Sequence, residues 1–93
     1  MILHTFLKSL GDTASAVADT LKSKGIRGRR GSRCHCPIAI AIYENCSLRV
    51  RISSHAVNSD DSDGLRLACL LDYPAVHDFI CRFDNGYYPG LEW

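Results

Sequence analysis

The 93-residue sequence lacks any uninterrupted apolar run approaching the ~18–20 residues that a membrane-spanning helix needs. It also lacks a convincing secretion signal, because Lys8 interrupts the apolar N-terminal stretch and a polar segment follows it. We therefore expect a cytoplasmic protein, in which cysteines stay reduced or bind metal. The five cysteines agree with this expectation, since an odd number cannot close a framework of paired disulfides.

Signatures of catalysis and nucleotide binding are missing as well. The glycine-rich segment 25–31 has neither the GxGxxG order of a dinucleotide-binding turn nor the lysine of a P-loop. No two carboxylates follow the pattern of a general acid–base pair. Asp60, Asp61 and Asp63 resemble half of a calcium-binding loop, but no glutamate closes it at the required spacing, so we interpret them as a polar turn. These absences favour a protein that is not an enzyme.

What the sequence does contain is one dense run of positive charge. The net charge is only +1, yet six of the eleven Lys and Arg residues lie between Lys22 and Arg33, with no acid among them. Glycines alternate with these arginines, so we expect residues 25–36 to form an exposed loop. Guanidinium groups bind carboxylates and phosphates. The loop could bind an acidic protein, bind nucleic acid or be merely solvated, and its lack of aromatic residues for base stacking weighs against nucleic acid.

A basic strand extends this candidate surface. Leu48, Val50 and Ile52 alternate with two arginines, which is typical of a strand with one buried face and one exposed basic face. The protein's candidate binding residues are therefore Arg27, Arg29, Arg30, Arg33, Arg49 and Arg51.

Two cysteines and a histidine occupy residues 34–36 at the end of the loop, just before Pro37. The C-x-C spacing found there is uncommon in structural zinc sites and no second ligand pair exists, so we expect no metal and no cofactor. Cys36 is either a nucleophile, with a pKa lowered by a helix dipole and nearby arginines, or a buried helix cap, which we favour. A zinc- or thiol-dependent function stays as an alternative. Its candidate ligands are Cys34, His35, Cys36 and Cys46, with His55, Cys69 and Cys81 as further choices.

Hydrophobic spacing predicts a single α+β domain over residues 1–93. Apolar residues recur every three or four positions from Leu3 to Leu21, which predicts an N-terminal helix; residues 1–11 are either its first part or a separate arm. Pro37 favours a short helix over residues 37–45, although the β-branched residues there also suit a strand. A two-stranded sheet is marginal alone, so helices should cover one face, and a second copy could form a homodimer at its edge. The later elements expected are a β-hairpin of strands 48–53 and 65–71 around a turn at 58–64, a helix from Pro74, and an aromatic tail at 87–93 that folds back.

Two motifs in the chain resemble those of known small proteins. GIRG at residues 25–28 precedes CPIA at residues 36–39, and the pattern PxVxxFIxxFDxGxYPxL begins at Pro74. Together they resemble small uncharacterised proteins of actinobacteria and their phages, over residues 16–91. The resemblance implies a similar architecture in a prokaryotic or viral cytosol, and it implies no catalytic residue. With the arginine loop, it leads us to expect a small binding protein that acts as a regulator or inhibitor by occupying the surface of a macromolecular partner.

Overall fold

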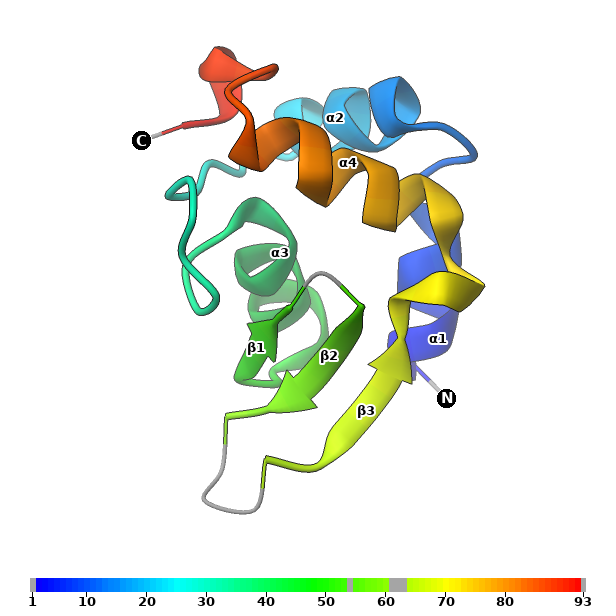
Figure 1. Cartoon of the computed structure of the whole chain (residues 1–93). Helices are drawn as coiled ribbons and strands as arrows, with labels where there is room; N and C mark the ends of the chain where they lie inside the picture. The colour runs from blue at the N-terminus through cyan, green and yellow to red at the C-terminus, as the bar shows by residue number, and fades with distance from the viewer. Residues whose placement is uncertain (1, 54, 61–63, 93) are drawn as a thin grey trace.

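Helices and one antiparallel sheet share a hydrophobic core in the computed structural model, which describes residues 2–53, 55–60 and 64–92 (Figure 1). This arrangement confirms the predicted α+β class. No helix within these residues has both the length and the apolar character needed to cross a membrane. The helices are α1 (Ile2–Ser9), α2 (Ala14–Ser23), α3 (Pro37–Cys46) and α4 (Pro74–Asp84), and the strands are β1 (Val50–Ile52), β2 (Ala56–Ser59) and β3 (Arg66–Cys69).

A turn at Gly11 divides the expected N-terminal helix into α1 and α2. Gly11 has a φ of 144°, which favours glycine, and a Cβ there would lie 2.7 Å from the Cβ of Ala16. Thr13 is the N-cap of α2, because its side-chain oxygen accepts a hydrogen bond from the Ala16 N–H at 3.1 Å. Both helices contribute to the same core. Their most deeply buried side chains include Leu3, Leu7, Leu10, Val17 and Leu21.

α3 forms in the segment whose sequence suited either a helix or a strand, and the predicted short helix is confirmed. Cys36 is its N-cap, with Sγ accepting a hydrogen bond from the Ala39 N–H at 3.4 Å, and Pro37 occupies the first turn. Ile38 and Ile42, one helical turn apart, are both fully buried, so packing outweighs their preference for strands. The start of α3 therefore lies directly against the end of the loop 25–36.

The sheet has three strands in the order β1-β2-β3, which corrects the predicted two-stranded hairpin. The additional strand, β2, overlaps the segment 58–64 that its composition predicts to be a turn. The polypeptide reverses earlier, at Ser53, whose N–H donates to the Ala56 carbonyl at 2.9 Å and whose Oγ accepts from the Ala56 N–H at 3.0 Å. Residues 53–56 contain neither glycine nor proline, and serine is a weaker turn signal, so the Asp- and Gly-containing segment that follows appears as the turn in the sequence.

The pairing of β2 with β3 contains a bulge. Val57 lies opposite Ala68, and the next residue of β2, Asn58, lies opposite Arg66, so one residue of β3, Leu67, is extra. No strand in the described residues pairs with the outer edge of β1. This edge is contacted by the loop instead, because the Ile52 N–H donates to the Arg33 carbonyl at 2.8 Å.

The C-terminal helix α4 packs against α2, and the tail folds back as predicted for part of its length. The Tyr88 ring stacks on Phe79 at 5.3 Å between centroids, and Leu91 is buried. Tyr87 is the exception to the predicted burial. Its side chain stays 64% exposed, with the Arg82 guanidinium 5.9 Å from the ring centre. Trp93, which was expected to be buried with the tail, lies outside the described residues.

Candidate binding surface

Residues 28–31, in the first half of the arginine loop 25–36, contact the C-terminal segment 84–92. The Gly28 N–H donates to the Leu91 carbonyl at 2.8 Å, and the Gly31 N–H donates to Asp84 Oδ1 at 3.1 Å. Arg30 Nε lies 3.9 Å from Glu92 Oε1, so this guanidinium faces an acid within the protein. Arg30 is therefore partly neutralised, although it belongs to the acid-free run of the sequence.

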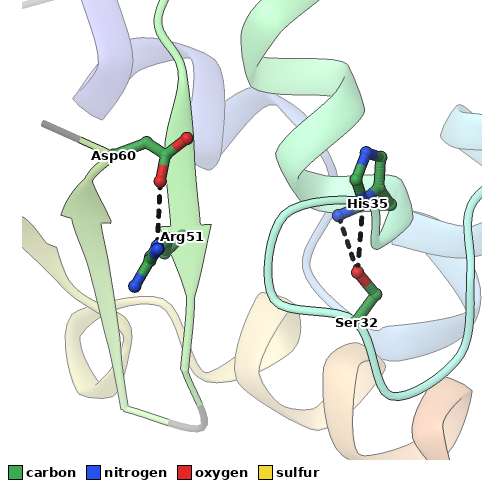
Figure 2. Close-up of polar contacts among 4 residues, drawn as sticks. All are labelled: Ser32, His35, Arg51 and Asp60. Carbon is green, nitrogen blue, oxygen red and sulfur yellow. Dashed lines mark hydrogen bonds and ion pairs between the residues drawn. The ribbon is translucent and has the colours of Figure 1, made fainter.

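The second half of the loop is attached to the sheet. Ser32 Oγ accepts a hydrogen bond from the His35 N–H at 3.2 Å and lies 3.4 Å from its Nδ1, which closes a turn around Arg33 (Figure 2). The Arg33 carbonyl then accepts the hydrogen bond from Ile52 of β1. This bond holds the Arg33 side chain at the same hollow as Arg51. The hollow has a volume of about 390 Å³ and is lined by Arg33, Arg51, Ser53, Asn58, Ser59, Asp60 and Gly64.

Arg51 forms an ion pair within this hollow. Its Nε donates to Asp60 Oδ1 at 2.8 Å, and the two side chains point toward each other across the sheet (Figure 2). The Asp60 carboxylate raises the pKa of Arg51, and Cys34 adds a smaller effect in the same direction. Both partners remain exposed, at 59% and 34%, so the pair keeps Arg51 oriented but accessible to a ligand.

Arg66 joins this surface, and the sequence did not indicate it. Residues paired across antiparallel strands present their side chains on the same face of a sheet. Asn58 pairs with Arg51 on one side and with Arg66 on the other, so the three lie in a row across the outer face. If the ladder were regular, Leu67 would lie opposite Asn58, and Arg66 would pair with Ser59 and lie on the opposite face. We call Arg33, Arg51, Asn58 and Arg66 the sheet-face cluster.

The other predicted binding residues lie outside this cluster. Arg49 lines a neighbouring hollow, where its guanidinium lies 5.5 Å from the centre of the Tyr43 ring. Arg27 and Arg29 are exposed in the first half of the loop, next to Arg30. The structure thus brings Arg33 and Arg51 together, adds Arg66, and turns Arg30 toward the C-terminal segment.

Cys36 has the environment of a structural thiol. It is only 5% exposed, and burial raises its pKa to about 11, while hydrogen bonds from the N–H groups of Ala39 and Ile38 lower it by less. A nucleophilic cysteine needs the opposite shift, because the thiolate is the reactive form. The predicted buried helix cap is therefore confirmed, and burial outweighs the helix dipole and arginines that would have activated the thiol.

The suggested zinc ligands do not converge. Cys36 precedes α3 and Cys46 is its last residue, so ten residues of helix, about 15 Å at 1.5 Å per residue, separate the two. A zinc ion requires all four ligands within about 2.3 Å. Among the residues that the structure describes, no group of three or more His, Cys, Asp or Glu side chains is positioned to hold a metal ion.

Comparison of the chain with known protein families, with curated proteins and with solved structures finds no significant match. The resemblance to small proteins of actinobacteria and their phages therefore stays a prediction, and the function has to be argued from the surface itself.

Proposed function

We propose that the chain is a non-enzymatic binding protein, which occupies an acidic protein surface with its sheet-face cluster. The hydrogen bond between the Ile52 N–H and the Arg33 carbonyl carries this proposal, because it fixes a loop arginine at the hollow of Arg51, on the sheet face that also carries Arg66. Among the residues that the structure describes, this face has three guanidinium groups and one carboxylate, that of Asp60, and so a positive charge. Arginine forks orient carboxylates through paired hydrogen bonds, and arginine is enriched at protein interfaces.

The lining of the hollow favours a protein partner over nucleic acid. Apart from charged groups it offers Ser53, Asn58 and Ser59, which form hydrogen bonds but cannot stack on bases. Single-stranded nucleic acid is usually held by aromatic side chains as well as by positive charge. None of the described residues that line this hollow is aromatic, and the nearby Arg49 rests over the Tyr43 ring in a neighbouring hollow.

The test compares two variants that remove equal charge from different surfaces. The first changes Arg33, Arg51 and Arg66 to Gln; the control changes Lys24, Arg27 and Arg29 to Gln, all of which are exposed. Each protein is immobilised and exposed to lysate of the source cells, with and without nuclease, and bound proteins are quantified by mass spectrometry. We expect a partner that the wild type and the control capture, that the first variant loses, and that resists nuclease.

Two results would contradict the proposal. If both variants capture the partner equally, the sheet-face cluster does not bind it. If nuclease removes it, nucleic acid is the ligand, and binding of oligonucleotides should then weaken steeply with salt in the wild type and be reduced in the first variant.

A further inference from the structure

A second surface of the molecule exposes apolar side chains that no other element covers. It is a hollow of about 810 Å³ between the end of α3 and the start of β3. Tyr43, Leu48 and Leu65 line it with exposures of 50%, 37% and 65%, and they are three of the five large hydrophobic residues that are exposed in the described chain. Such clustering of exposed apolar groups marks an interaction site, whereas scattered ones need no explanation.

The same hollow contains one acid and one base, Glu44 and Arg49. Neither side chain forms an ion pair with any residue that the structure describes, whereas Arg30, Arg51 and Arg82 each face an acid. Arg49 rests over Tyr43 within the hollow, as described above. The apolar patch is therefore bordered by two opposite charges, both of which are available to a partner.

The charges of Glu44 and Arg49 favour one kind of partner for the apolar patch over others. An acidic segment would meet Glu44, and a basic segment would meet Arg49. A second copy of the same surface, turned by a two-fold axis, places Glu44 against Arg49 twice and apolar side chains against one another at the centre. We propose that this hollow is the interface of a symmetric homodimer, with reciprocal Glu44–Arg49 pairs around a centre formed by Tyr43, Leu48 and Leu65.

The dimer surface adjoins the hollow of the sheet-face cluster at Ser59, but it uses different charged and apolar side chains. Arg33, Arg51 and Arg66 do not line this hollow, and the residues of the proposed dimer centre do not line the hollow beside Arg51. Dimerisation and capture of an acidic partner can therefore be tested one at a time.

The first experiment compares two leucines of nearly equal exposure. Leu65 lines the hollow, whereas Leu71, which is 64% exposed, does not. Sedimentation velocity of the purified chain is followed from about 5 µM to about 500 µM, which brackets the affinity of a modest interface. We expect the wild type and Leu71→Asp to dimerise alike, and Leu65→Asp to weaken the dimer at least about 100-fold. A wild type that remains monomeric throughout, or a dimer that survives Leu65→Asp, would overturn the proposal.

The second experiment exchanges the two charges. Glu44→Arg and Arg49→Glu each create like-charge contacts across the axis, and each should weaken the dimer about 10-fold. The double variant Glu44→Arg, Arg49→Glu restores opposite charges and should return the dissociation constant to within about threefold of the wild type. Circular dichroism checks that each variant is folded. If the double variant is no tighter than the single ones, the two residues do not pair and the proposed interface is wrong.

Discussion

The two halves of the loop 25–36 both contain arginine, but they lie in different surroundings. Residues 28–31 are bonded to the C-terminal segment, where Arg30 faces Glu92, whereas Arg33 is bonded to β1 and shares a hollow with Arg51. In Figure 1 the loop leaves the end of α2 and passes beside α3 toward the sheet. The comparison teaches that charge density in a sequence does not define a binding surface. Backbone bonds to distant elements decide which arginines act together.

The largest effect is expected at the point where the first half of the loop crosses the start of α3. A Cβ on Gly28 would lie 2.4 Å from the Pro37 nitrogen and 2.6 Å from the His35 carbonyl oxygen. These are backbone atoms that cannot move aside alone. Gly28→Ala should therefore lower the free energy of unfolding by about 3 kcal/mol, measured by urea denaturation.

Gly90→Ala is the matched control, because a Cβ there would meet the flexible end of Lys22 at 3.6 Å, an ordinary contact. Its stability should change little. Equal destabilisation by the two substitutions would mean that the loop does not approach α3 closely at Gly28.

The next effect concerns Cys36, where the second half of the loop enters α3. Its pKa is about 11 in the folded protein and 9.0 for an ordinary thiol. Between these two pH values the unfolded chain loses the thiol proton while the folded chain retains it. The contribution of this thiol to the free energy of unfolding is therefore fully present below pH 9.0 and is lost as the pH rises to about 11. At about 1.4 kcal/mol per pKa unit, the loss over this difference of about two units is roughly 2–3 kcal/mol.

Cys36→Ser isolates this contribution, since a hydroxyl can cap the helix but does not titrate in this range. Urea denaturation of both proteins as a function of pH should give curves that diverge above pH 9.0. Parallel curves would show that the thiol is not buried as described.

A smaller effect is expected where the first half of the loop is bonded to α4. Asp84→Ala removes the acceptor of the Gly31 N–H and should cost about 1 kcal/mol. Asp78→Ala is the comparison on the same helix, because Asp78 forms an exposed pair with Arg82 one turn away, and it should cost less. Hydrogen exchange at Gly31 sharpens the test: exchange should accelerate in Asp84→Ala and not in Asp78→Ala.

Features encoded by neighbouring residues were predictable, and features that depend on distant pairing were not. Pro37 after Cys36 indicates a capped helix locally, and the spacing of Val76, Phe79 and Phe83 indicates a buried helical face. The strand β2 was missed because Ser53 makes its turn without a glycine or proline. The division of the arginines was equally hidden, since Asp84 and Glu92 approach the loop only in the folded chain.

The extra residue in β3 has a consequence for how this chain tolerates change in length. Deleting Leu67 would make the ladder with β2 regular while Arg66 stays opposite Asn58, so the sheet-face cluster would keep its strand arginines. A deletion between two regularly paired residues turns the side chains beyond it to the other face of the sheet. The bulge therefore marks a position where β3 can lose a residue without moving Arg66 to the opposite face.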